Sequence, residues 1–169
     1  QEKRGHPMLF NEGDVIKADT LFKIIKYGEK VLIGDITAIW HDAGHILGSG
    51  FIEITAEGKR LVFSGDLGNN DMPILRPLEQ LPQADLVLME STYGGYLHDD
   101  PKNRAQALRA CIMETLQEKG VLMIPAFSIE RVQEILYELN ELAENGKIPR
   151  VPIFLDSPLA IRATRVFKE

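Results

Sequence analysis

The stretch from His41 to Gly68 constrains the fold of this chain more than any other part of the sequence. It contains two glycine-rich loops, AGHILGSG with His45 and SGDLG with Asp66, and each loop follows a strand-like run. Glycine lets a backbone turn sharply and approach a ligand closely. An imidazole and a carboxylate held on rigid strand ends suit a hard or borderline metal ion. His45 and Asp66 are therefore candidate metal ligands, although the residues alone favour a turn aspartate at Asp66.

Alternating apolar and polar residues predict strands around these loops, at 21–27 and 36–41. The runs 51–55 and 60–64 are joined by Ala-Glu-Gly-Lys, which predicts a hairpin with Gly58 at positive φ. Such a hairpin would bring the two glycine-rich loops close together in space.

The apolar run 85–90 predicts a buried strand that ends in Glu90. Active sites of α/β proteins gather at the carboxyl ends of strands, which makes Glu90 a candidate site residue. The alternative is a carboxylate that caps the next turn. The preceding segment, 69–83, contains three prolines and is expected to be a long surface loop.

Helical and strand patterns alternate after Glu90. Asp100 and Pro101 are typical of a helix start, and Gly120 is typical of a helix end. The order β-α-β-α-β-α implies a parallel sheet with right-handed crossovers. The expected segments are a helix from 100 to 120, a strand at 121–124, a helix from 128 to 145, a strand at 152–155 and a third helix from 157 onward.

Ser128 and Ser157 each lie just past a predicted strand and at the start of a predicted helix. Helix N-termini carry free N–H groups and partial positive charge, which suit a phosphate. Arg131 follows in the first turn of the second helix and adds a guanidinium. These residues are candidates for phosphate binding. The alternative is that the serines are only caps and that Arg131 is a surface or domain-bridging charge.

The composition is that of a globular protein, with 44% hydrophobic and 26% charged residues among 169. No apolar run approaches the roughly 18 residues of a membrane span. The single cysteine, Cys111, excludes an internal disulfide and is expected to be a core thiol. Together these features favour a cytoplasmic protein. The net charge of −6 argues mildly against a nucleic-acid partner, but a metal cluster or a local basic patch can bind phosphate in an acidic protein.

The other histidines are weaker ligand candidates. His6 and His98 are expected to be loop residues, and His41 a strand-end histidine that does not pair with His45. Asp42 could either hold a metal ligand in its orientation through a hydrogen bond or bond the backbone of a turn.

Five motifs in order resemble the β-CASP branch of the metallo-β-lactamase superfamily, the nucleic-acid-processing metallohydrolases. They are GHILGS, SGDLG, ESTYGG at Glu90, IPAFSIERVQEIL at Ile124 and LDSPLA at Leu155. The resemblance implies that residues 1–95 are the C-terminal portion of a metallo-β-lactamase αββα sandwich and that residues 96–169 are the first half of a parallel-sheet, Rossmann-like β-CASP domain. In this family His45 and Asp66 would hold metal, and Asp66 could bridge two ions. Glu90 would support a histidine general acid.

The implied activity is hydrolysis of phosphodiester bonds in RNA, or in DNA, with two Zn²⁺ ions in the complete protein. Single-stranded substrate fits a crevice between two domains better than a duplex does. A homodimer and either endonuclease or exonuclease action are compatible with the motifs. The alternatives are a non-catalytic scaffold or binding subunit of an RNA-processing complex and a metallohydrolase of small esters.

The family's HxHxDH motif and its later histidine motifs do not occur in the sequence. We therefore expect an internal fragment of a longer protein, inactive by itself, because catalytic zinc usually has three protein ligands.

Overall fold

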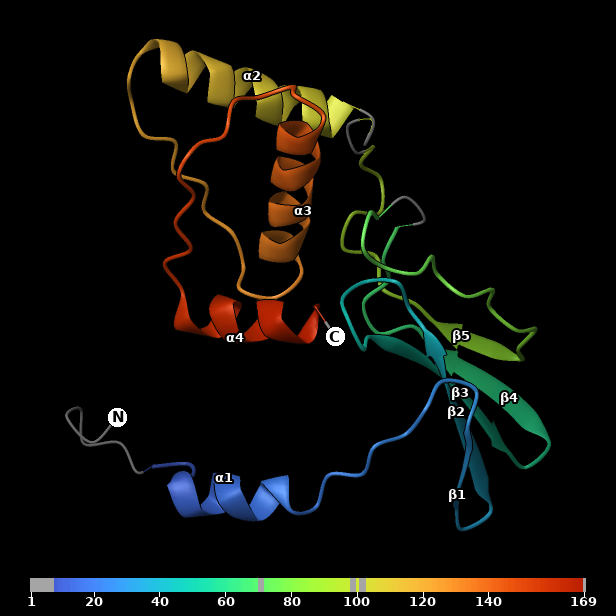
Figure 1. The fold of residues 1–169 in the computed structure, drawn as a ribbon. Helices are drawn as coiled ribbons and strands as arrows, with labels where there is room; N and C mark the ends of the chain where they lie inside the picture. Colours follow the sequence, from blue (N-terminus) through green and yellow to red (C-terminus); the bar gives the residue numbers. More distant parts are fainter. Residues whose placement is uncertain (1–7, 70–71, 98–99, 101–102, 169) are drawn as a thin grey trace.

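The computed structural model describes residues 8–69, 72–97, 100 and 103–168 of the chain (Figure 1). It is an α/β structure with a sheet in the first half and helices in the second. The elements are α1 (Glu12–Asp19), β1 (Lys30–Ile33), β2 (Ile36–Asp42), β3 (Gly50–Ala56), β4 (Lys59–Phe63), β5 (Leu86–Leu88), α2 (Arg104–Gln117), α3 (Arg131–Glu144) and α4 (Pro158–Val166).

The five strands form one mixed sheet in the order β1-β2-β3-β4-β5. The first four strands pair antiparallel, and β5 pairs parallel with β4. Two-residue turns join β1 to β2 and β3 to β4 as hairpins, whereas the longer loop 43–49 joins β2 to β3. Glu57 and Gly58 between β3 and β4 have φ values of 50° and 72°, as a type I′ turn requires. The predicted hairpin and the positive φ of Gly58 are confirmed.

The N-terminal part of the described chain differs from the expectation. The segment 21–27 is not a strand, and a short helix, α1, forms at Glu12–Asp19. Asn11 and Asp14 form a reciprocal capping box, in which each side chain accepts a hydrogen bond from the other residue's backbone N–H. The segment 21–27 has no paired strand in the described part of the chain, which explains why its apolar alternation does not form one.

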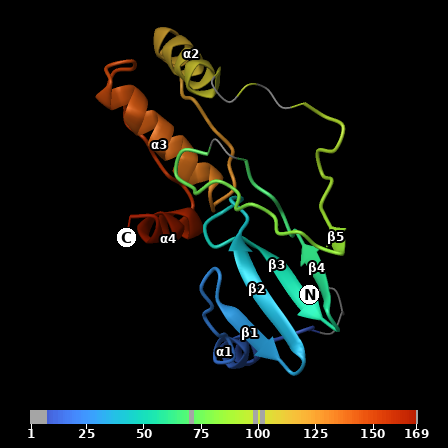
Figure 2. The same cartoon turned by 90° about the vertical axis from the view of Figure 1, so that its right-hand side faces the viewer.

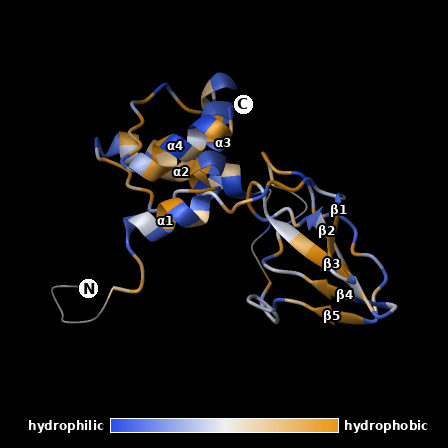
Figure 3. Ribbon diagram, turned by 90° about the horizontal axis from the view of Figure 1, so that it is seen from below, coloured by the Kyte–Doolittle hydropathy of each residue, from blue (hydrophilic) through white to orange (hydrophobic). Residues whose placement is uncertain are grey.

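Two small hydrophobic cores stabilise the two halves. In the first half, Ala43, Phe51 and Val62 are fully buried against Leu67 and the segment that precedes β5. Asp85 holds β5 beside β4, because its carboxylate accepts hydrogen bonds from Lys59 Nζ and Arg60 N, both at 2.9 Å. Unlike the buried strand that the sequence predicts, β5 is about half exposed along its whole length. Figure 3 shows it as a hydrophobic strand at the edge of the sheet.

The helical half packs around Ile112 of α2, Leu139 and Leu142 of α3, and Ile148 beyond it. The helices that the sequence predicts at 100–120 and 128–145 are present, each shorter than expected, as α2 and α3. Cys111 is exposed, so the expected core thiol is wrong; its neighbour Ile112 occupies the buried position instead. Figures 1 and 2 show α2, α3 and α4 standing beside the sheet rather than covering its face.

The segments 121–124 and 152–155, which the sequence predicts as strands, have no regular secondary structure. They do not pair with each other or with another segment of the described chain, and their apolar side chains remain exposed, among them Met123 at 85% and Phe154 at 88%. A strand needs partners for its N–H and C=O groups. The expected parallel sheet is therefore not formed in this structure, and the β-α-β-α-β-α order is present only as helices and connecting segments.

None of the helices in the described ranges is long and apolar enough to cross a membrane.

Replacing Phe51 by alanine tests the first core. Phe51 is completely buried, so we expect Phe51→Ala to lower the free energy of unfolding by about 3–5 kcal/mol. Leu32→Ala in β1 is the control, since Leu32 is 76% exposed and its loss should change stability little. Urea denaturation measures both variants; equal effects would mean that Phe51 is not the centre of this core.

Candidate metal and phosphate site

The two glycine-rich loops contact each other directly. The N–H of Gly68 donates to the carbonyl of Ala43 at 2.9 Å, and a Cβ atom at Gly68 would overlap the carbonyl group of Gly44. Gly44 itself has a φ of +60°, and a Cβ there would lie 2.8 Å from the backbone N of Leu78. Only glycine fits this approach, which explains why both loops carry it and why the backbones of the loops that carry His45 and Asp66 touch.

Hydrogen bonds within the first loop hold the backbone at His45. Ser49 Oγ accepts from the N–H groups of His45 and Ile46, at 3.0 and 3.2 Å. The carboxylate of Asp42 accepts from the N–H of Gly44 at 2.9 Å. Asp42 is therefore a turn residue here, one of the two roles that the sequence leaves open.

The side chains of His45 and Asp66 are exposed, and within the described ranges neither has a hydrogen-bond partner. An imidazole nitrogen and a carboxylate without other partners suit metal coordination. The described residues contain no group of three or more histidine, cysteine, aspartate or glutamate side chains that could hold an ion. His45 and Asp66 therefore fit as two ligands of a metal, and they do not make a complete site by themselves.

Glu90 supports the second loop. Its Oε1 accepts the N–H of Leu67, the residue after Asp66, at 2.7 Å, and its own N–H donates to Ser64 Oγ at 3.0 Å. A hydrogen bond from Thr92, and then that from Leu67, lower the pKa of Glu90, so the group is a carboxylate at neutral pH. Glu90 thus caps its own next turn and also positions the loop of the candidate ligand.

His41 does not join the site. Its Nδ1 lies 2.8 Å from Glu79 Oε1, its Nε2 lies 3.3 Å from Glu53 Oε2, and its ring stacks on Phe51 with a centroid distance of 4.7 Å. Both ring nitrogens are thus engaged, which agrees with a strand-end histidine. His6 and His98 lie outside the described residues.

The structure brings Ser128 and Ser157 together, with their Oγ atoms 3.2 Å apart. Ser157 caps α4 and accepts the N–H of Ala160 at 3.2 Å, as expected. Ser128 does not cap α3, which begins after Glu130. Gln133 fixes the Ser128 backbone instead, by donating to its carbonyl and to Thr164 Oγ1 of α4. The two hydroxyls are adjacent polar groups at the N-terminal ends of two helices.

Arg131 is ion-paired but accessible. Its guanidinium lies 3.3 Å from Glu134 Oε2, and 56% of its side chain is exposed. Glu134 is buried, and burial raises the pKa of its carboxyl group. The pair leaves the remaining guanidinium N–H groups at the surface, where an anion could reach them.

Glu130 is a residue that the motif interpretation missed. Its carboxylate accepts the N–H of Leu47 at 3.1 Å, which joins the N-terminal end of α3 to the loop of His45. Burial raises the pKa of Glu130, and the charge of Glu134 acts in the same direction. No local sequence signal could have revealed this contact, because it depends on how two segments far apart in the chain are placed.

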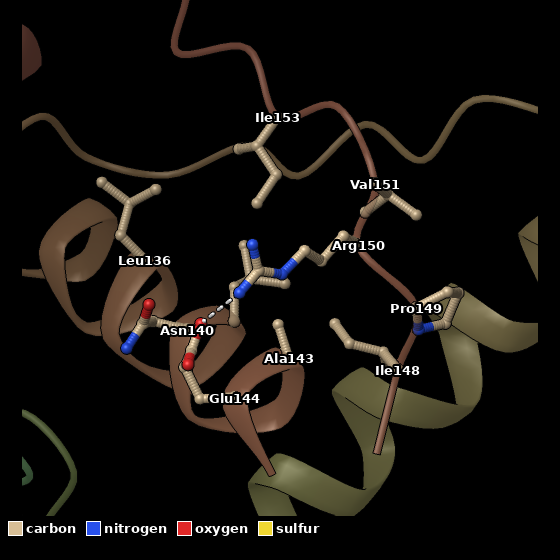
Figure 4. Close-up of a pocket in the computed structure, with 10 residues that line it drawn as sticks. Leu136, Asn140, Ala143, Glu144, Ile148, Pro149, Arg150, Val151 and Ile153 are labelled. Atoms are coloured by element: carbon tan, nitrogen blue, oxygen red, sulfur yellow. Dashed lines mark hydrogen bonds and ion pairs between the residues drawn. The ribbon is translucent and has the colours of Figure 1, made fainter. Parts of the chain in front are cut away.

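Two pockets lie in the helical half. The smaller, about 330 Å³, is formed by α3 and the segment after it, and Arg150 bonds Glu144 across it at 3.2 Å (Figure 4). None of the predicted site residues lines it. The larger, about 770 Å³, lies between α2, α3 and the segments 121–126 and 151–157, and Ser157 is at its border.

The sequence of this chain is similar to those of known proteins. The Beta-Casp domain family matches residues 132–169. The chain is 38% identical to the ribonuclease TTHA0252 of Thermus thermophilus, over 94% of this chain and 36% of that protein. It is 36% identical to an RNase J-like protein of Methanocaldococcus jannaschii, over 83% and 34% of the two chains. It is 32% identical to subunit 3-I of the cleavage and polyadenylation specificity factor of Arabidopsis thaliana, over 95% and 24%.

The chain belongs to the β-CASP branch of the metallo-β-lactamase superfamily. It spans about a third or less of the length of these relatives. Two of the three are named as ribonucleases or as RNase-like, so the family resemblance that the sequence motifs indicate is confirmed.

A methyl group at Gly68 tests the contact between the loops. We expect Gly68→Ala to lower the free energy of unfolding by roughly 1–3 kcal/mol, because the Cβ atom would overlap the Gly44 carbonyl group and force the loops apart. Gly120→Ala is the control, since its Cβ would make only ordinary contacts, at 3.7 Å. Denaturation curves compare the two; a Gly68 variant as stable as the control would contradict the close approach.

Proposed function

We propose that the protein to which this chain belongs is a zinc-dependent hydrolase that cleaves phosphodiester bonds of single-stranded RNA. The observation that supports this proposal most is that the candidate metal ligands are linked to the candidate phosphate-binding hydroxyls. The exposed candidate ligands His45 and Asp66 lie on touching loops. The first loop is bonded to Glu130, two residues after Ser128, whose hydroxyl pairs with that of Ser157. The names of the ribonuclease relatives favour RNA over DNA.

The proposed roles follow from these placements. His45 and Asp66 hold zinc together with ligands outside the described residues. When bound, zinc makes water a nucleophile at neutral pH and stabilises negative charge on the phosphate. Glu90 holds the Asp66 loop through Leu67 and remains available to support a general acid.

Phosphate groups are proposed to bind on the helical side. The hydroxyls of Ser128 and Ser157 donate to phosphate oxygens, and the accessible face of Arg131 adds positive charge. These contacts go to the backbone of the nucleic acid, so they position the strand without reading its sequence.

The domain assignment is part of the same proposal. Residues 1–95 would belong to a metallo-β-lactamase domain and residues 96–169 to the first half of a parallel-sheet β-CASP domain. The separate hydrophobic cores of the two halves support a boundary between β5 and α2. The exposed apolar segments 121–124 and 152–155 support the assignment as strands that need further partners.

Metal content and activity test the role of Asp66 in the full-length protein. We expect Asp66→Asn to lose zinc and to reduce kcat on labelled single-stranded RNA by more than the roughly 10–100-fold typical of residues outside the ligand set. Asp35→Asn is the matched control, because Asp35 is an exposed turn residue of the same sheet. Zinc that survives Asp66→Asn would contradict the ligand assignment. Stoichiometric zinc without RNA cleavage would instead favour a binding subunit.

Substrate binding tests Ser128. Removing one hydrogen bond to a charged phosphate, worth about 1.5–3 kcal/mol, should raise KM roughly 10- to 150-fold and leave kcat unchanged in Ser128→Ala. The control is Thr115→Ala, which removes a hydroxyl bonded within α2. A loss of kcat at constant KM would place Ser128 outside phosphate binding.

A further inference from the structure

Glu130 lies between the two halves of the chain and belongs to neither core. It precedes α3, yet its Oε2 accepts the N–H of Leu47, two residues after His45, at 3.1 Å. The residue is 5% exposed. A carboxylate of the helical half is thus inserted into the loop that carries a candidate metal ligand, and Figures 1 and 2 show this loop beside the N-terminal end of α3.

The Glu130 carboxylate has little else to hold it. It makes no capping hydrogen bond to α3, and its Oε1 is buried without a partner in the described part of the chain. The charge of Arg131 attracts it, whereas that of Glu134 repels it. Burial of a carboxylate with one bonded oxygen is unfavourable, so helix stability does not explain this side chain.

The backbone of Glu130 is also unusual. Its φ of 68° and ψ of −66° lie where residues other than glycine are rarely found. Such conformations persist only where the surrounding structure over-determines them, and they cluster at functional sites. A glycine would adopt this backbone more easily, but it could not reach Leu47.

We propose that Glu130 is a positioning residue that fixes the His45 loop relative to the paired hydroxyls of Ser128 and Ser157. This inference rests on the proposed function. Leu47 follows His45 by two residues, and Ser128 precedes Glu130 by two residues, so one carboxylate ties the candidate metal ligand to the candidate phosphate site. Catalysis by two such groups depends on their relative placement to within fractions of an ångström.

Two substitutions at Glu130 separate the effect of its carboxylate from the effect of its backbone conformation. Glu130→Gly removes the acceptor and relieves the positive φ, so the fold should be retained. Glu130→Gln keeps an oxygen that can accept the Leu47 N–H. Glu141→Gln is the matched control, because Glu141 lies exposed on the same helix. All three are made in the full-length protein, and their thermal transitions are compared with that of the wild type.

Hydrogen exchange of the segment 44–49 gives a readout that is independent of activity. We expect about tenfold faster exchange of the Leu47 amide in Glu130→Gly, the factor that corresponds to losing one hydrogen bond of about 1.4 kcal/mol, and no change in Glu130→Gln or the control. Unchanged protection in Glu130→Gly would overturn the proposal.

Kinetics distinguish positioning from structural support. We expect kcat on single-stranded RNA to fall between about tenfold and a hundredfold in Glu130→Gly at nearly constant KM, with activity restored in Glu130→Gln. A rise in KM at constant kcat would overturn the positioning role. If the wild type does not cleave RNA, the proposed function fails, and hydrogen exchange still decides whether Glu130 holds the loop.

Discussion

The close approach of Gly44 and Gly68 is the contact on which the candidate site depends. Two loops that follow β2 and β4 meet with no room for a Cβ atom, and this contact holds together the loops that carry His45 and Asp66. Ala43 of the first loop, Phe51 of β3 and Val62 of β4 are fully buried in one cluster. The same core that stabilises the sheet therefore also anchors the loops. Because backbone atoms make the contact between the two loops, the side chains of His45 and Asp66 remain exposed.

The two halves of the chain meet through polar contacts more than through a shared core. Each half has its own hydrophobic cluster, and the bond between Leu47 and Glu130 crosses from one to the other. Interfaces of this kind permit relative movement unless specific contacts oppose it. The placement of His45 relative to Ser128 therefore depends on directional contacts such as this one, and this gives the single buried carboxylate of Glu130 an effect on both candidate sites.

Elements with strong local signals could be predicted, and elements that depend on distant partners could not. The turn at Gly58, the cap at Ser157 and the apolar spacing of α2 and α3 are short-range features, and the structure has all of them. The strands expected at 121–124 and 152–155 are absent, because a strand forms only beside a partner. The helix at Glu12–Asp19 was not predicted from the sequence, although its capping box is a local feature.

The sequence by itself determined the family, the two glycine-rich loops and the residues that suit metal and phosphate. These depend on residue type and spacing along the chain, which the motifs record directly. Only the tertiary structure decided that Ser128 and Ser157 share a hydrogen bond, that both nitrogens of His41 are engaged and that Glu130 reaches Leu47. Each of these contacts joins residues that are 12 to 83 positions apart. Their geometry follows from how whole elements pack, and no local pattern of residues encodes it.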